Sequence, residues 1–232
     1  MLSPSVVSLE FERVDGLPLA FKAGQWLNLT LPLPGESIRR AYSIASPPWG
    51  ASQFEIAVTL VQPTSDIPGG RGSALLHALQ PGDVLDASGP HGFFVRDPYS
   101  PVSALFIATG TGVTPLRSMA QAAAAASAQA SMRLLFGARH EEDILYRDEW
   151  RELEKNIDFR ADYTLSQPGD LWDGKRGYVQ AHVREIWDEL TARGKPAHVY
   201  ICGLKPMVTA VRDLLRNEMQ LPREVVHSER YD

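Results

Sequence analysis

"FIATGTGVTPLRSM", residues 106–119, decides the fold, because it joins an apolar run to a glycine turn and a helix start. Gly110 and Gly112 follow the apolar run directly, and Pro115 suits the first turn of a helix. Glycines let the backbone turn sharply and approach a ligand, and free N–H groups at a helix start attract phosphate. The third glycine of GxGxxG is missing. The stretch therefore predicts a strand, loop and helix that either bind a nucleotide or form a tight turn without a ligand.

The sequence on the two sides of this stretch follows different patterns. Toward the C-terminus, apolar runs alternate with helical segments, which predicts βαβ units around a parallel sheet. Toward the N-terminus, short alternating runs are separated by Pro, Gly and Asp, which predicts an antiparallel β-barrel or sandwich with one inserted helix, and we expect the barrel. Pro98 and Pro101 bracket a short linker. We therefore expect two domains, residues 1–98 and 99–232.

Composition excludes several classes of function. The 232 residues are 44% hydrophobic and 22% charged, as in globular proteins. The net charge is -5 and the Lys and Arg residues are scattered, so nucleic acid is not an expected partner. The sequence shows neither a membrane-spanning run nor a signal peptide, and we expect a cytoplasmic protein that does not bind membranes. The single cysteine excludes CxxC zinc sites and cysteine-held iron–sulfur clusters, so redox chemistry requires an organic cofactor.

Two further stretches contain residues suited to ligand binding. In "PGGRGSALLHALQPGD", residues 68–83, a glycine turn precedes a short helix with Ser73 near its start. The backbone amides and the hydroxyl suit a pyrophosphate, although Ser73 alternatively serves only as a helix cap. In "YICGLKPMVTAV", Cys202 ends an apolar strand, where open parallel sheets bind their ligands. The alternative is a cysteine buried as a small hydrophobic residue.

In order and spacing, these motifs resemble the ferredoxin-NADP reductase family of two-domain flavoenzymes. The likeness covers essentially the whole chain and crosses the change from β to α/β pattern. Five motifs carry it: RxYS (Arg40, Tyr42, Ser43), GGxxS (Gly69, Gly70, Ser73), GTGxxP (Gly110 to Pro115), CGLKxM (Cys202 to Met207) and the terminal SERYD.

The resemblance implies that FAD binds to the N-terminal domain. Arg40 would pair with the FAD pyrophosphate, an anion suited to a guanidinium group. Tyr42 would stack on the isoalloxazine ring, and Ser43 would place its hydroxyl near flavin N5. The glycine turn and short helix would wrap the pyrophosphate through Gly70, Arg71 and Ser73.

The resemblance also implies a nicotinamide nucleotide on the C-terminal domain. Its pyrophosphate would lie on the loop formed by Gly110, Thr111, Gly112 and Pro115. The catalytic residues would be Ser43, with Cys202 beside the nicotinamide ring and Glu229 and Tyr231 near the chain's end. Tyr231 would cover the second flavin face and swing away for nicotinamide. The family tyrosine is the last residue, whereas Asp232 follows it here.

The residues expected around a 2′-phosphate depart from the family pattern. Ser166 is present, but Gln167 replaces the family arginine, and Lys175, Arg176 and Tyr178 follow. A phosphate dianion prefers a bidentate cation, so the loss of one arginine weakens the preference for NADPH. Lys175 and Arg176 alternatively form only a solvated turn. The pattern favours NADPH over NADH slightly.

We therefore expect an FAD-dependent NAD(P)H oxidoreductase that transfers hydride between nicotinamide and flavin and passes electrons to a separate acceptor. The candidates are ferredoxin, flavodoxin, an oxygenase and a small oxidant. The acidic net charge argues mildly against ferredoxin, itself usually acidic. The alternative is a flavin- or nucleotide-binding regulatory or electron-transfer subunit with little turnover alone. The joint presence of Ser43, Cys202, Glu229 and Tyr231 favours the enzyme.

Overall fold

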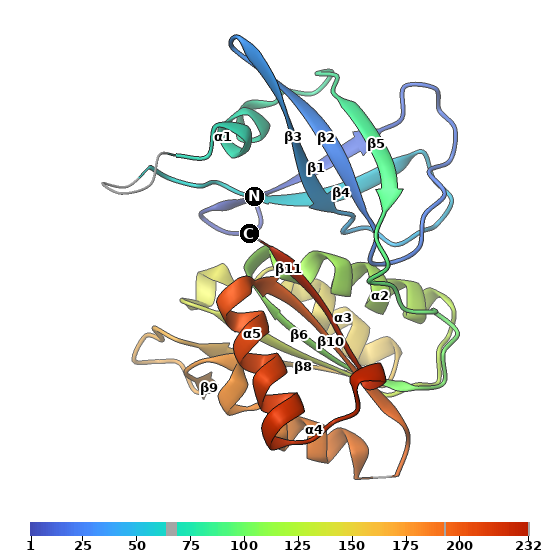
Figure 1. The fold of residues 1–232 in the computed structure, drawn as a ribbon, viewed down its shortest axis with the longest axis vertical. Helices are drawn as coiled ribbons and strands as arrows, with labels where there is room; N and C mark the ends of the chain where they lie inside the picture. The colour runs from blue at the N-terminus through green and yellow to red at the C-terminus, as the bar shows by residue number, and fades with distance from the viewer. Residues whose placement is uncertain (64–68, 193, 232) are drawn as a thin grey trace.

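The computed structural model describes residues 1–63, 69–192 and 194–231. An antiparallel β domain forms from the first part of the chain, and a domain with a parallel sheet covered by helices forms from the rest (Figure 1). The predicted fold class is therefore confirmed. No helix in the described ranges is long and apolar enough to cross a membrane.

The described residues of the N-terminal domain form five strands and one short helix. In β2, Leu27, Leu29 and Leu31 are all buried in one core, because alternate side chains of a strand point to the same face. The described strands are hydrogen-bonded as two antiparallel sheets, ordered β1–β4 and β3–β2–β5. The elements are β1 (Val6–Glu12), β2 (Trp26–Leu33), β3 (Glu36–Ser43), β4 (Gln53–Thr59), α1 (Arg71–Ala78) and β5 (Asp86–His91).

Across residues 99–192 and 194–231, the C-terminal domain has a six-stranded parallel sheet ordered β11–β10–β6–β7–β8–β9. Its strands are β6 (Ser103–Thr109), β7 (Met132–Ala138), β8 (Phe159–Leu165), β9 (Lys175–Arg176), β10 (Ala197–Leu204) and β11 (Val226–Tyr231). Its helices are α2 (Val113–Ala125), α3 (Arg147–Asn156), α4 (Val183–Thr191) and α5 (Lys205–Asp213). Short 3-10 turns are Gly110–Gly112, Glu141–Asp143, Val179–Ala181 and Arg223–Val225, and the π-helical turn Leu214–Glu218 extends α5.

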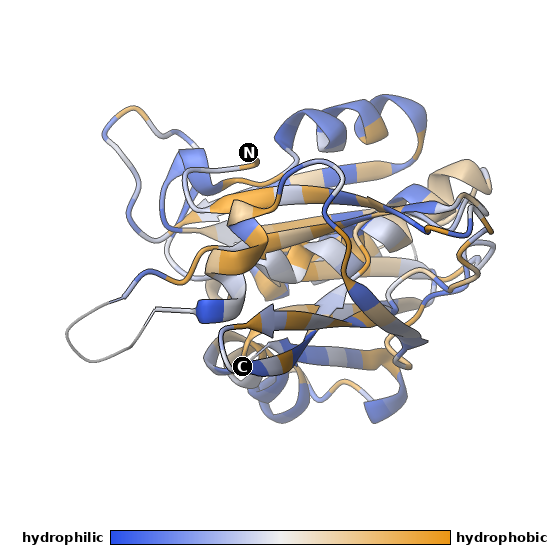
Figure 2. Ribbon diagram, turned by 90° about the horizontal axis from the view of Figure 1, so that it is seen from above, coloured by the Kyte–Doolittle hydropathy of each residue, from blue (hydrophilic) through white to orange (hydrophobic). Residues whose placement is uncertain are grey.

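Both faces of the parallel sheet are covered. Helices α2 and α3 pack on one face and α4 and α5 on the other, each over its own apolar core. Strand β6 is central, which explains its uninterrupted apolar sequence. Figure 2 shows the same arrangement as hydrophobic segments in the strands and hydrophilic segments in outer helices and loops.

The connection between the sheets, residues 92–102, is held by a buried arginine. The Arg96 side chain donates to the carbonyl oxygens of Asp97 at 3.2 Å and Val102 at 2.8 Å. Residue 98, after which the domain boundary is predicted, lies in this connection, and the boundary itself stays a prediction.

Candidate functional site

A groove of about 1810 Å³ lies between the two domains. The N-terminal domain forms one side of the groove with β3 and the start of α1. The C-terminal domain forms the other side with the carboxyl ends of β6, β7, β8 and β11. Open parallel sheets bind ligands at this edge. A pocket for one small ligand measures roughly 300–1,000 Å³. The groove therefore has room for more than one nucleotide-sized molecule.

Most of the predicted site residues line this groove. Three of them do not: Pro115 is buried in the first turn of α2, Cys202 is buried in β10, and Arg176 lies outside the lining. The lining includes Arg40, Tyr42, Ser43, Gly70, Arg71, Ser73, Gly110, Thr111, Gly112, Ser166, Tyr178, Glu229 and Tyr231.

The glycine loop after β6 is shaped by two different requirements. Gly110 has φ +53°, a left-handed conformation, and a Cβ there would meet no atom within 4 Å. Gly112 lies so close to β10 that a Cβ would come 2.4 Å from the Cys202 carbonyl oxygen. The Thr114 hydroxyl donates to the Thr111 carbonyl at 2.8 Å and closes the loop. Gly112 therefore serves close packing, and Gly110 serves the turn itself.

The hydroxyl of Ser73 is already used within its own loop. It donates to the Gly70 carbonyl at 2.9 Å and accepts the Val61 N–H at 3.1 Å. Helix α1 has Gly70 at its N-cap and no side-chain cap hydrogen bond. Ser73 therefore holds the turn that precedes α1, and its contact with a phosphate stays a prediction.

Three of the four predicted catalytic side chains meet directly at the centre of the groove. The Tyr231 hydroxyl donates to Ser43 Oγ at 2.6 Å, and Ser43 Oγ donates to Glu229 Oε1 at 3.4 Å. The Thr114 hydroxyl lies 3.3 Å from that of Tyr231. Cys202 is paired with Glu229 in the parallel register of β10 and β11. Ser43 comes from the N-terminal domain and the other residues from the C-terminal domain, so the cluster exists only when the domains are together.

Burial sets the charge of this cluster. It raises the pKa of Glu229 to about 7, against a smaller opposite effect of the Ser43 hydrogen bond. Burial likewise raises the pKa of Tyr231, and the pKa of Cys202 is raised first by burial and then by the Glu229 carboxylate. At neutral pH the cluster thus holds a neutral phenol, a neutral thiol and a carboxyl group that exchanges its proton.

Replacing Glu229 with Gln should change how stability depends on pH. The folded protein keeps a proton on Glu229 that the unfolded chain loses at an ordinary pKa, so wild-type stability falls between about pH 4.5 and pH 7. Above pH 7 this loss is complete and is on the order of 3 kcal/mol. Urea unfolding of both proteins should show that the free energy of unfolding of E229Q, relative to that of the wild type, rises by this amount between about pH 4.5 and pH 7. A difference that stays constant with pH would contradict the assignment.

Two domain profiles and a near full-length relative match this chain. The oxidoreductase FAD-binding domain matches residues 2–95, and the oxidoreductase NAD-binding domain matches residues 106–213. Ferredoxin–NADP reductase B of Sorangium cellulosum is 57% identical over 234 residues, which cover 100% of this chain and 93% of that protein. The chain belongs to the ferredoxin-NADP reductase family. It is an FAD-dependent NAD(P)H oxidoreductase that passes electrons to a separate acceptor.

The chain also matches part of some longer proteins. A glycine betaine monooxygenase reductase subunit of Pseudomonas aeruginosa is 32% identical over 84% of this chain, which spans 52% of that subunit. The crystal structure of the Amycolatopsis cytochrome P450 reductase GcoB superposes with a TM-score of 0.81 at 25% identity, over 99% of this chain and 66% of GcoB.

The groove of this reductase fits FAD on its N-terminal side. Arg40 and Arg71 supply two guanidinium groups, and Arg71 is paired with Glu36 across the groove's rim. Tyr42 is half-buried: it packs on the core of the β domain, lines the groove, and has a pKa raised by burial. An apolar ring beside two cations suits a flavin with its pyrophosphate.

The two cations predicted to bind a 2′-phosphate, Lys175 and Arg176, form hydrogen bonds with other groups of the protein. Lys175 Nζ pairs with both carboxylate oxygens of Glu185 at 3.0 Å, and Arg176 donates to the Trp172 carbonyl at 2.7 Å. Ser166 and the exposed Tyr178 do line the groove.

Sequence reasoning missed Arg139. This exposed arginine follows β7 and lines the groove, and its carbonyl accepts the Gln167 N–H at 2.9 Å, beside Ser166. Its position directly after a buried strand is the signal that points to it, because the carboxyl ends of parallel strands gather at one edge.

Proposed function

We propose that this chain oxidises NADPH and passes the electrons to a ferredoxin-type acceptor in the cytoplasm. The observation that carries the proposal is the meeting of Ser43 with Glu229 and Tyr231 across the two domains. The 57% identity to a ferredoxin–NADP reductase supports the choice of acceptor.

On the N-terminal side, residues 1–98 form the FAD-binding domain. Arg40 and Arg71 bind the pyrophosphate, and the Gly70 turn, held by Ser73, brings backbone N–H groups toward it. Tyr42 stacks on the flavin ring. These residues would hold the flavin in the part of the groove that the Ser43 hydroxyl lines.

On the C-terminal side, residues 99–232 bind the nicotinamide nucleotide. The loop of Gly110, Thr111 and Gly112 presents its backbone to the pyrophosphate, and Pro115 rigidifies the first turn behind it. Tyr231 leaves its hydrogen bond with Ser43 when the nicotinamide enters. Cys202, a neutral and buried thiol on β10, packs behind the place where the nicotinamide would bind. Asp232, which follows Tyr231, lies outside the described residues.

The protein's part in the reaction is to position two cofactors and to exchange a proton. When bound, FAD would supply the redox chemistry, since a flavin can accept two electrons from a nicotinamide and release them singly to the acceptor. Glu229, with a pKa of about 7, exchanges a proton with the Ser43 hydroxyl. Glu229 is fixed by the pairing of β11 with β10, and Ser43 by the pairing of β3 with β2, so neither group has to be ordered during the reaction.

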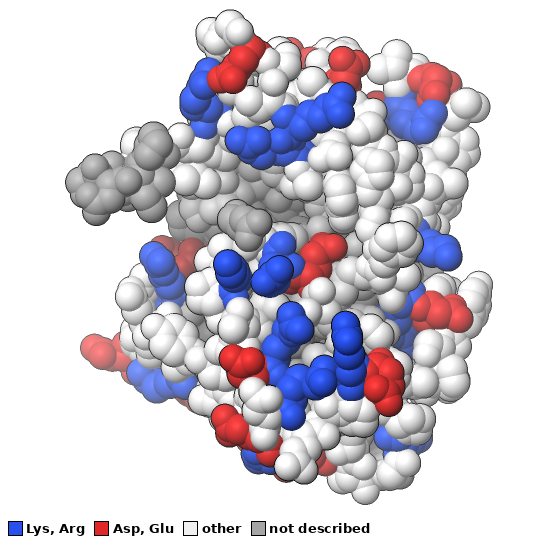
Figure 3. Space-filling model, viewed as in Figure 1, with Lys and Arg blue, Asp and Glu red and all other residues white. Residues whose placement is uncertain are grey.

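A ferredoxin-type partner fits the charge around the groove. Figure 3 shows Lys and Arg side chains along both edges of the hollow between the domains, although the net charge is -5. Among the described residues, four arginines line the groove (Arg40, Arg71, Arg139 and Arg230) against three carboxyl residues (Glu36, Asp143 and Glu229), so positive charge is in slight excess there. This local positive charge attracts an acidic carrier and steers its approach.

Anaerobic stopped-flow mixing tests the function. We expect NADPH to bleach the flavin's visible absorbance rapidly, and an added oxidised [2Fe–2S] ferredoxin to restore it. Ferredoxin reduction should weaken as salt rises, because exposed charges are screened. A flavin that neither NADPH nor NADH bleaches would instead indicate a binding subunit with little turnover. A flavin that is reduced but returns electrons only to small oxidants would exclude the ferredoxin-type acceptor.

We expect Arg139, which lies beside Ser166, to contact the 2′-phosphate of NADPH. Replacing Arg139 with Ala should therefore raise the KM for NADPH roughly tenfold to hundredfold, because this charge-assisted contact is lost. The KM for NADH, which has no 2′-phosphate, should change little. Arg176→Ala is the matched control, since that guanidinium donates to the Trp172 carbonyl. Steady-state kinetics of both variants with both nucleotides check this. If R176A raises the KM for NADPH and R139A does not, the 2′-phosphate binds at the turn of Lys175 and Arg176 and not at Arg139.

A further inference from the structure

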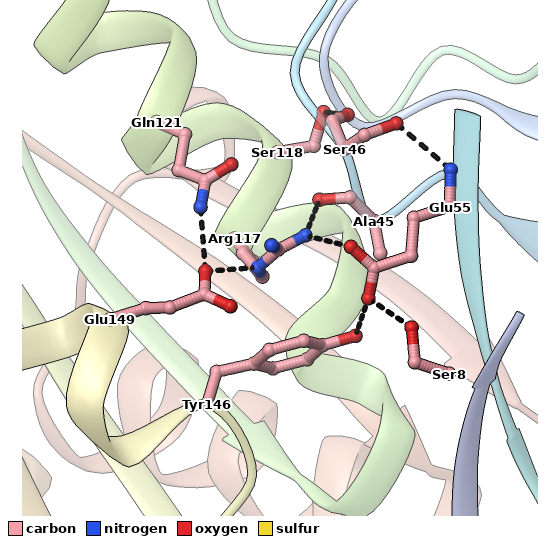
Figure 4. A network of polar contacts seen from close by, with 9 residues as sticks. All are labelled: Ser8, Ala45, Ser46, Glu55, Arg117, Ser118, Gln121, Tyr146 and Glu149. Carbon is pink, nitrogen blue, oxygen red and sulfur yellow. Dashed lines mark hydrogen bonds and ion pairs between the residues drawn. The ribbon is translucent and has the colours of Figure 1, made fainter. Parts of the chain in front are cut away.

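A buried arginine outside the groove joins the two domains. Arg117 on α2 is 7% exposed. Its Nη1 donates to the Ala45 carbonyl at 2.9 Å and to Glu55 Oε2 at 2.8 Å, both in the N-terminal domain. Its Nε donates to Glu149 Oε2 at 2.7 Å within its own domain. Figure 4 shows this one guanidinium group between carboxylates from both domains.

The carboxylate of Glu55 is held as firmly as the arginine that it binds. Its Oε1 accepts the Tyr146 hydroxyl at 2.9 Å and the Ser8 hydroxyl at 2.5 Å. The Arg117 guanidinium lies over the Tyr146 ring, 4.3 Å from its centroid. Tyr146 lies next to α3, so a second residue of the C-terminal domain contacts Glu55 (Figure 4). The Arg117 guanidinium and the Glu55 carboxylate are therefore each hydrogen-bonded to residues of both domains.

The network lies immediately behind the catalytic cluster in both domains. Ala45 follows Ser43 by two residues, and Arg117 follows Thr114 by three on α2. The next residue of the helix, Ser118, donates to the Ser46 carbonyl at 2.7 Å. The backbone after β3 and the first turns of α2 are thus bonded to each other directly behind Ser43 and the nucleotide loop.

We propose that Arg117 is a positioning residue: its bonds to Glu55 and Ala45 set the approach of the nucleotide loop to Ser43, and hence the geometry of hydride transfer. The inference rests on the proposed function. A misplacement of about 1 Å far from the chemistry can cost roughly hundredfold in rate. Only the planar fork of arginine bonds Ala45, Glu55 and Glu149 together, since a lysine ammonium lacks this fixed geometry.

The test compares R117K and R117Q with the wild-type holoenzyme. At saturating NADPH, the rate of flavin bleaching should fall roughly tenfold to hundredfold, with FAD content and the Kd for NADP⁺ unchanged. Calorimetry gives a readout independent of turnover. The wild type should unfold in one transition, whereas R117Q should show two, because the domains no longer unfold together.

Arg133→Gln is the matched control. The Arg133 side chain is 12% exposed and pairs with Asp162 and Glu189, all within the C-terminal domain. R133Q should lose stability while keeping a single transition and the wild-type rate of bleaching. If R117Q does not fold, the bleaching rates of R117K and E55Q test the proposal in its place. A folded R117K or E55Q that bleaches at the wild-type rate, or an R133Q slowed as much as R117K, would overturn the proposal. Absence of bleaching in the wild type would instead refute the proposed function, and calorimetry would still decide whether Arg117 couples the domains.

Discussion

Gly112→Ala is expected to destabilise the protein by about 3 kcal/mol or more and to reduce its affinity for NADP⁺ roughly hundredfold. The added Cβ would lie 2.4 Å from the Cys202 carbonyl oxygen and 2.6 Å from Gly203 Cα. These are backbone atoms of a buried strand, so neither can rotate away. The loop from Gly110 to Gly112 must therefore move off β10 and out of its position for the nucleotide.

Thermal unfolding and calorimetric titration with NADP⁺ measure the two effects. Gly110→Ala is the control in the same loop, because its Cβ meets no atom within 4 Å and it faces only the strain of φ +53°. That strain costs about 1–2 kcal/mol. If both variants lose the same stability and affinity, the close approach of Gly112 to β10 does not hold the loop.

Ser43→Ala is expected to slow flavin reduction by NADPH about hundredfold, within the range attributed to one acid–base group. The Ser43 hydroxyl accepts from Tyr231 at 2.6 Å and donates to Glu229 at 3.4 Å, so it joins the two groups. Without it, the Tyr231 hydroxyl keeps the 3.3 Å contact with Thr114 and its contact with the Cys202 thiol. The lost hydrogen bond should cost about 1–2 kcal/mol of stability.

Tyr231→Phe separates the two roles of Ser43. This variant removes the bond to Ser43 and keeps both the aromatic ring and the bond between Ser43 and Glu229. Stopped-flow bleaching should therefore show a much smaller decrease for Y231F than for S43A. Equal decreases would mean that Ser43 acts only by holding the tyrosine.

Strongly apolar segments could be predicted from sequence alone. The runs at residues 103–109 and 132–138 coincide with β6 and β7, because a strand that is covered on both faces favours a mostly apolar run, which in β7 is interrupted only by Arg133. The approach of Ser43 to Glu229 was predictable only through the family resemblance, since 186 residues separate them.

Other features left no pattern in the sequence. Strand β11 contains His227, Ser228, Glu229 and Arg230, and it forms because its backbone pairs with the edge of β10, not because its residues favour a strand. The sequence around a single charged residue likewise does not indicate which residue it pairs with. Nothing near Glu55 on β4 indicates that its partner, Arg117, lies 62 residues away on a helix of the other domain.

The burial of Cys202 has a practical consequence. It is the only cysteine of the sequence, it is 0% exposed, and its raised pKa keeps it as an unreactive thiol. A cysteine introduced on the surface of each domain would thus be the site that maleimide probes modify, with the native residue left in place. Fluorescence energy transfer between two such labels would then report the separation of the domains during turnover in an otherwise unaltered protein.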